Sequence, residues 1–292
     1  MLVDIRKLDS WSSFIESVRN GPVRKVGSGG QSFPSRVLYR GHTNPDWPLW
    51  SPLDRRLTTW VKKPDTEEVE YWSARKEKGL GWYDKLCSEI LDQFKQACRG
   101  VPTIDPGTTD DEYWALGRHF GLFTPLLDWT LSPYVAAFFA FGEHLRNMER
   151  GGGAFTLKGS KGSVRVWALA VWDEIEVRQE FEVLQVHPRV AARQRAQSGL
   201  FTRLRSKEHL ELLPYFASRG LSDALVAYDI PMDGAAHAMR DLQLMNITPA
   251  TLFPDLYGAA WQANVDNLQI HFASVMYDWD PGKADTGPST VV

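Results

Sequence analysis

The chain has 292 residues, of which 43% are hydrophobic and 24% are charged, and its formal net charge is −3 at pH 7. These values are typical of an ordinary globular protein with enough length for a sizeable core, and they neither demand nor exclude a nucleic-acid partner. No apolar run is long enough to cross a membrane and the N-terminus lacks the pattern of a secretory signal, so we expect a cytoplasmic protein with no membrane partner. Cys87 and Cys98 are the only cysteines, and the histidines lack ligand spacing, so no disulfide framework and no metal are expected.

The first 35 residues are predicted to form a small N-terminal region of their own. Residues 1–20 have the pattern of a short strand followed by an amphipathic helix, which Asp9 or Ser10 could cap. Gly21 to Ser35 is a loop rich in glycine and serine. Its glycines fit neither nucleotide-binding fingerprint, so a surface loop is expected.

A short strand follows and carries an arginine near its end. The segment Arg36 to His42 includes the apolar run Val37-Leu38-Tyr39, then Arg40 and Gly41. An arginine in this position suits a phosphate or carboxylate clamp, and a glycine beside it would let a ligand approach closely. The alternative is an arginine paired with a structural carboxylate, for which Asp128 is a candidate, and both interpretations stay open.

The next two segments are predicted to be helical. Residues 66–99 carry glutamates in the first turn and an apolar stripe at helical spacing. Asp110, Asp111 and Glu112 then precede a second helical stretch. Three adjacent acids could suggest a metal site, but capping of this helix explains them more simply.

The most informative stretch runs from Gly117 to Phe141. We expect a strand at Leu122–Leu127 and then a very apolar helix that begins at Pro133. Asp128, Thr130 and Ser132 alternate at the corner between them, beside free amides of the helix N-terminus, where a polar or anionic ligand would be stabilised. The alternative is a capped helix in which these side chains only satisfy backbone groups.

The remaining chain alternates predicted strands and helices, without repeats. One mixed α/β domain at residues 36–280 is the simplest organisation, after the N-terminal region 1–35 and before a disordered tail at 281–292. Strands are expected at 164–172, 181–186, 200–204 and 225–230, and helices at 235–245 and, last in the chain, through Trp261.

Four ordered blocks of sequence resemble one known family. They are Leu38-Tyr39-Arg40-Gly41, the run from Arg118 to Thr130, Arg193 with the run from Ala196 to Thr202, and the run from Leu252 to Leu256. The first block corresponds to the Phe/Tyr-Arg-Gly signature of the FRG domain, and the chain resembles that family over most of its length.

A second resemblance is to the ADP-ribosyltransferase fold. That fold places an Arg or His at the end of its first core strand, a Ser/Thr motif on the second and a Glu at the start of a later strand; here Arg40, Thr130 with Ser132, and Gln197 follow in that order. The resemblance implies a single α+β or mixed α/β domain with a central, mostly antiparallel sheet flanked by helices. Gln197 stands in the place of the glutamate, with Glu182 as the alternative.

The resemblance also implies roles for individual residues around NAD, which would be a substrate. Gln197 would bind a ribose hydroxyl beside the scissile bond, and His119 or Asp128 would orient the nucleophile or stabilise the developing positive charge. The residues expected to hold the phosphates and ribose are Tyr39, Arg40, Gly41, Thr130 and Ser132.

The function implied is NAD cleavage with transfer of ADP-ribose to an unknown protein or nucleic-acid acceptor, in a toxin or antiviral defence effector with an antitoxin or defence-system partner. The alternative is a nucleic-acid or nucleotide binding or processing module without NAD chemistry, and a third option is a non-enzymatic sensor or scaffold. The basic residues that motivate the alternative are Arg189, Arg193, Arg195, Arg203 and Arg205. If the first interpretation holds, Arg40, Asp128 and Gln197 should line one cleft.

Overall fold

A computed structural model describes most of the chain. The described residues are 4–21, 25–27, 30–32, 34–62, 69–101, 104–105, 107–150, 162–172, 180–186 and 192–265. The predicted tail at 281–292 and Arg189 lie outside these ranges.

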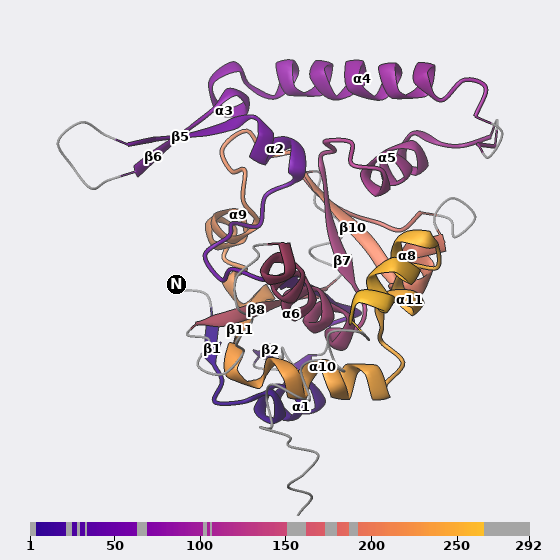
Figure 1. Cartoon of the computed structure of the whole chain (residues 1–292). Coiled ribbons are helices and arrows are strands. Elements are labelled where there is room, and N and C mark those ends of the chain that lie inside the picture. Colours follow the sequence, from indigo (N-terminus) through magenta and orange to yellow (C-terminus); the bar gives the residue numbers. More distant parts are fainter. Residues whose placement is uncertain are drawn as a thin grey trace, which may run out of the picture.

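A seven-stranded sheet forms the centre of the described structure (Figure 1). Every neighbouring pair in it is antiparallel except β1 and β11. The prediction of a mixed α/β fold with a mostly antiparallel sheet flanked by helices is therefore confirmed. In spatial order the strands are β1 (Asp4–Lys7), β11 (Leu225–Pro231), β8 (Ser163–Val171), β4 (Arg36–His42), β7 (Leu126–Thr130), β10 (Gly199–Leu204) and β9 (Phe181–Leu184).

Helix α6 (Pro133–Arg150) packs directly against β4 and β8. Its buried side chains include Ala136, Phe138 and Phe141, each 0% exposed, as expected for an apolar core helix. The approach to β4 is very close, because a Cβ on Gly41 would lie 2.0 Å from the Ala136 carbonyl oxygen. The glycine is therefore required by helix packing, whether or not it also lets a ligand approach.

Helices α1 (Trp11–Arg19) and α10 (Ala235–Leu244), from the two ends of the chain, pack beside this core. Helix α1 begins after Ser10, whose side chain accepts a hydrogen bond from the Ser13 amide, so one of the two predicted caps is correct. Trp11 reaches α10, where its Nε1 donates to Asp241 at 2.9 Å. The chain continues through α9 (Leu212–Ser218), α11 (Pro249–Leu252) and helical residues 256–265.

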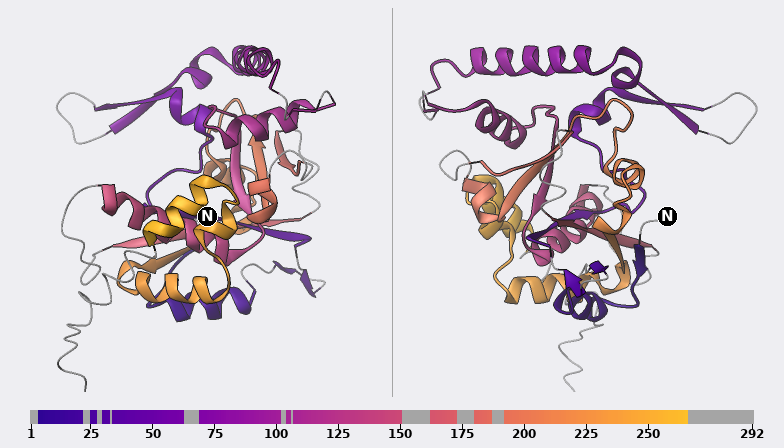
Figure 2. Two further views of the ribbon diagram at one scale, coloured as in Figure 1. Left: turned by 45° about the vertical axis from the view of Figure 1, so that its right-hand side comes forward. Right: turned by 180° about the vertical axis from the view of Figure 1, so that it is seen from behind.

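One group of elements stands apart from the sheet at one end of the molecule (Figures 1 and 2). The predicted helix over 66–99 is wrong in its first part, because residues from Val69 form a strand and Gly79, with φ of +83°, separates two helices. The projecting elements are α2 (Pro52–Arg56), β5 (Thr58–Lys62), β6 (Val69–Ser73), α3 (Ala74–Lys78) and α4 (Leu80–Ala97).

A second correction concerns the predicted loop at Gly21–Ser35. This segment contains a two-stranded antiparallel ribbon of β2 (Lys25–Gly27) and β3 (Gly30–Ser32).

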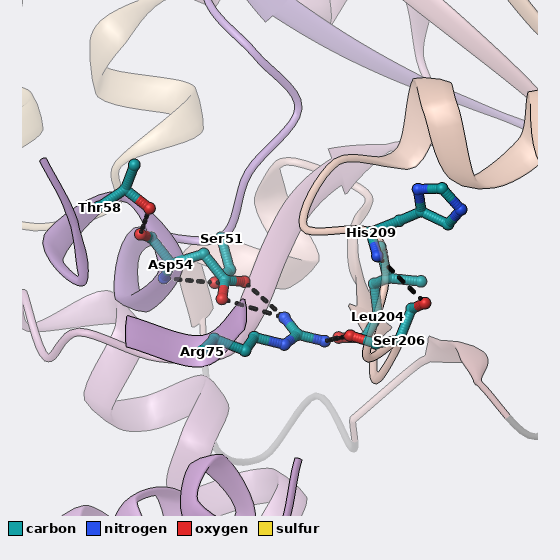
Figure 3. A network of polar contacts seen from close by, with 7 residues as sticks. All are labelled: Ser51, Asp54, Thr58, Arg75, Leu204, Ser206 and His209. Carbon is teal, nitrogen blue, oxygen red and sulfur yellow. Dashed lines mark hydrogen bonds and ion pairs between the residues drawn. The ribbon is translucent and has the colours of Figure 1, made fainter. Parts of the chain in front are cut away.

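A buried ion pair fastens these projecting elements to the sheet (Figure 3). Arg75 of α3 is 0% exposed, and its Nη1 contacts both carboxylate oxygens of Asp54 at 3.0 and 3.1 Å. Its Nη2 donates to the carbonyl oxygen of Leu204, the last residue of β10, at 2.7 Å and to that of Ser206, two residues later, at 3.0 Å. Ser51 completes the network by donating to Asp54. One guanidinium thus joins α2, α3 and the end of β10.

Two predicted boundaries around the informative stretch need correction. The strand lies at Leu126–Thr130 and not at 122–127, so Asp128 lies within a strand and not in a hinge. The acids before Tyr113 do cap α5 (Asp110–His119), where Thr109 and Glu112 form a reciprocal capping box. The strand expected at 181–186 is shorter and ends at Leu184.

Gly41→Ala should destabilise the protein by at least about 1–3 kcal/mol, the usual cost of overpacking, because the added Cβ meets the backbone of α6. Urea denaturation measures the change. Gly81→Ala is the matched control, since nothing lies within 4 Å of its Cβ position and alanine favours the helix by up to about 1 kcal/mol. Equal stabilities of Gly41→Ala and wild type would show that the close packing of α6 is incorrect.

Asp54→Asn should cost about 3–5 kcal/mol, because it leaves the charge of Arg75 buried and uncompensated. The control is Asp84→Asn, whose ion pair with Arg205 is exposed and should contribute at most about 1 kcal/mol. Chemical denaturation at neutral pH compares the two variants. The account of the buried pair fails if both variants lose the same small amount.

Candidate functional site

A pocket of about 280 Å³ lies where β4, β7 and β10 adjoin one another. Arg40, Asp128 and Gln197 all line it, so the three side chains that the sequence placed in one cleft do share one. Each of the four sequence blocks contributes to the lining. The other polar and aromatic residues around it include Arg118, His119, Arg193, Phe139, Phe201 and Phe253.

The strand register explains this convergence. Tyr39 of β4 is opposite Thr130 of β7, and Thr130 is in turn opposite Gly199 of β10. Arg40 follows Tyr39 directly, and Gln197 stands two residues before Gly199. Residues far apart in the chain are therefore brought together across three neighbouring strands.

The carboxylate of Asp128 lies between two arginines. Arg118, at the end of α5, donates to Asp128 Oδ2 from Nε at 3.1 Å and from Nη2 at 2.8 Å. Arg40 Nη1 lies 3.6 Å from the same oxygen and donates to the Asp128 carbonyl at 2.7 Å. Burial would raise the pKa of Asp128, but the two guanidinium groups outweigh burial and lower it. The carboxylate is thus ionised at neutral pH.

Arg40 is oriented by a histidine that the sequence interpretation missed. Its Nε donates to Nε2 of His42 at 3.0 Å, and the His42 side chain is buried. Burial, then the nearby arginines, lower the pKa of His42 to about 2, so its imidazole is neutral and can accept this bond. Burial also lowers the pKa of Arg40, to about 10, which still leaves it charged at pH 7. The sequence did contain a signal for this contact, because Arg40 and His42 are two residues apart on one strand and such residues share a face.

Thr130 and Ser132 organise the corner between β7 and α6. Thr130 Oγ1 donates to the Gln197 carbonyl at 2.7 Å and accepts from the Ser132 amide at 3.1 Å. The hydroxyl of Ser132 accepts from the Val135 amide at 3.3 Å, as a helix cap does. Thr130 lines the pocket together with Tyr39 and Gly41, whereas Ser132 is not part of the lining. The capping interpretation therefore describes the contacts of both hydroxyls.

Gln197 is held at the pocket from two sides. Its carbonyl accepts the bond from Thr130, and its Nε2 donates to the Leu252 carbonyl at 3.1 Å. The side-chain oxygen has no recorded partner among the described residues and can accept a hydrogen bond from a ligand. Glu182, the alternative to Gln197, is on β9, pairs with Arg203 and does not line the pocket.

The third and fourth sequence blocks meet at Arg193, which lies in α8 (Ala192–Ala196). Its Nε bonds Asp255 at 2.5 Å, and its guanidinium lies 5.2 Å from the ring centre of Phe253. The charge of Arg193 also affects His119. Burial, and after it Arg193, lower the pKa of His119 below the ordinary value of 6.5. His119 is therefore neutral at pH 7.

The predicted basic strip is largely neutralised by acidic partners. Arg203 pairs with Glu182 and Asp111, Arg205 pairs with Asp84, and Arg193 pairs with Asp255. Paired arginines on different elements do not form a free cationic surface, so this strip gives little support to the nucleic-acid alternative.

One of the comparisons with known proteins gave a match, over part of the chain. The family model described as the FRG domain matches residues 35–149, which include the first two sequence blocks. The chain therefore carries an FRG domain. The third and fourth blocks lie beyond the matched range, yet they complete the same pocket. The comparison with curated proteins and that with solved structures gave no match.

Membrane-spanning helices and clusters of metal ligands are both absent from the described residues. In the part of the chain that the structure describes, no helix has the length and apolar character needed to cross a membrane. Nor do three or more His, Cys, Asp or Glu side chains gather there in an arrangement that could hold a metal ion.

Proposed function

We propose that the protein is an NAD-dependent ADP-ribosyltransferase-like enzyme that cleaves NAD in this pocket and transfers ADP-ribose to an acceptor. The observation that carries the proposal is the meeting of Arg40 from β4, Asp128 from β7 and Gln197 from the turn before β10 in one pocket. The resemblance adds to this, because Arg40, then Thr130 with Ser132, then Gln197 follow the order in which the ADP-ribosyltransferase fold places its functional residues.

The pocket has the chemistry that such a substrate requires. Arg40 and Arg118 share the single carboxylate of Asp128, which leaves one positive charge for phosphate groups. Phe201 and Phe253 supply apolar faces for a planar ring. Its volume of about 280 Å³ is at the lower end of the usual range for small-molecule sites. We therefore expect the nicotinamide ribose to enter it and the adenosine half to lie outside.

The reaction breaks the bond between ribose C1′ and the nicotinamide nitrogen, and the bonding electrons leave with neutral nicotinamide. Positive charge then develops on the ribose, where the ionised Asp128 can stabilise it. The oxygen of Gln197 accepts a hydrogen bond from a ribose hydroxyl. An oxygen or nitrogen of the acceptor, or water, bonds to C1′, and its proton passes to neutral His119.

Asp128 supplies the carboxylate that the glutamate supplies in the ADP-ribosyltransferase fold. A neutral amide at Gln197 cannot offset positive charge, and Glu182 is engaged elsewhere. Depletion of NAD or modification of an essential acceptor would harm a cell. The proposal therefore includes a role as a toxin or antiviral effector, held in check by an antitoxin or another defence-system partner.

The test is incubation with NAD labelled in its nicotinamide, followed by mass analysis of the released base. Asp128→Asn should reduce release by about 100-fold or more, the usual effect of removing one stabilising group from a transition state. Release by the wild type should fall only at a pH lower than 6.5, the ordinary pKa of histidine, because burial lowers the pKa of His119 and delays its protonation.

The control for this test is Asp84→Asn, which removes a carboxylate from an exposed ion pair distant from the pocket and should leave release unchanged. Circular dichroism confirms that each variant is folded. Equal release by Asp128→Asn and wild type, or none from wild type supplied with protein and nucleic-acid acceptors, would refute the proposed chemistry.

A further inference from the structure

A second pocket adjoins the first and shares one side chain with it. Arg118, which holds Asp128 in the first pocket, also lines the second. Arg55 and Arg56 contribute from α2, and Phe123 from the loop between α5 and β7. Its lining contains three arginines and no acidic residue, on a chain whose formal net charge is −3. Arg118 shares the carboxylate of Asp128 with Arg40, so these four arginines together outnumber that one acid, and positive charge is concentrated beside the proposed reaction centre.

Two exposed phenylalanines accompany these arginines. Phe120 is 75% exposed and Phe123 is 50% exposed, although rings of this size usually bury their area. The loop that carries them is ordered by the end of α5: Gly121 takes φ of +92°, and the Leu122 amide donates to the Gly117 carbonyl at 2.8 Å. The rings are thus presented on a defined turn.

The buried ion pair fixes the arginines on the other side of this pocket. Asp54 faces inward from α2 to Arg75, and the next two residues, Arg55 and Arg56, are exposed (Figure 3 shows the pair). Arg56 has no ion pair with any residue that the structure describes. The ion pair between Asp54 and Arg75 therefore fixes α2 so that the arginines on its outer face, Arg55 and Arg56, line the same pocket as Arg118.

We infer that this second pocket is the acceptor subsite and that it binds single-stranded nucleic acid. Arginines bind the phosphates, and exposed aromatic rings stack on unpaired bases, which is how single strands are held without regard to sequence. A duplex hides its base faces, and the Asp and Glu side chains of an acidic peptide carry no aromatic rings, so both fit the combination less well. The shared Arg118 would place the strand beside Asp128. The acceptor role rests on the proposed function, whereas binding does not.

Fluorescence anisotropy with labelled oligonucleotides of about ten nucleotides tests the binding, a length within the usual site size. Single-stranded DNA, single-stranded RNA and duplex DNA are compared without NAD over a range of salt concentrations. We expect salt-dependent binding of one or both single strands. Arg56→Gln and Phe120→Ala should each weaken it by about 10-fold, and Arg56→Gln should lower the salt slope by roughly one.

Matched controls lie on α10, away from this surface. Arg240→Gln removes an exposed arginine and Leu244→Ala removes an apolar side chain that is 80% exposed, and neither should change binding. Absence of binding to both single strands, preference for the duplex, or equal binding by Arg56→Gln and Phe120→Ala and the wild type would overturn the inference.

A second measurement separates this inference from the proposed NAD chemistry. With NAD labelled in its ADP-ribose part, label on the oligonucleotide supports the acceptor role, and label on proteins alone overturns it. Because anisotropy is measured without NAD, failure of nicotinamide release would refute the chemistry and leave the binding result standing.

Discussion

The site depends on one carboxylate that is held between two guanidinium groups. Asp128 comes from the middle of β7, Arg118 from the end of α5 and Arg40 from β4, so their contacts join three elements at one point. The two cations keep the carboxylate ionised against the effect of burial. Without it, the two arginines that now share one oxygen atom would lie close together with no opposing charge. The same arrangement makes the pocket able to bind anions and to stabilise a cation.

The surrounding residues make this cluster rigid. His42 fixes the orientation of Arg40 through a neutral ring, and Gly41 lets α6 approach the strand that carries Arg40. Thr130 joins the corner of β7 to the turn that carries Gln197. The residues of the Tyr-Arg-Gly motif therefore have different roles: the glycine serves packing, and the arginine lines the pocket.

Sequence patterns predicted the elements whose signal is local. Alternating and then continuous apolar residues located β8, and the Ser-Pro pair located the start of α6. The resemblance to the ADP-ribosyltransferase fold was enough to predict that Arg40, Asp128 and Gln197 line one cleft. Boundaries failed where apolar residues run without a period: the run before Asp128 resembles a strand from Leu122, yet pairing with β10 begins only at Leu126.

Contacts between distant side chains were beyond the sequence. Nothing in the spacing of Arg118 and Asp128 shows that they pair, because this contact depends on how α5 folds back onto β7. The prediction of a helix over 66–99 did not take account of Val69-Glu70-Tyr71-Trp72. The β-branched and aromatic residues in this run favour a strand once a partner strand, β5, is available. The buried partner of Arg75 was likewise invisible, since charged residues at helical spacing usually face water.

Isothermal titration of ADP-ribose into the protein tests most directly whether this cluster forms an NAD site. The account predicts saturable binding to the wild type, weakened by about 10-fold or more in Arg40→Gln, as expected on losing a charge-assisted contact. Arg205→Gln, which removes an exposed arginine paired with Asp84, should bind as the wild type does. No heat of binding at millimolar ADP-ribose, or equal affinity in Arg40→Gln and wild type, would contradict it.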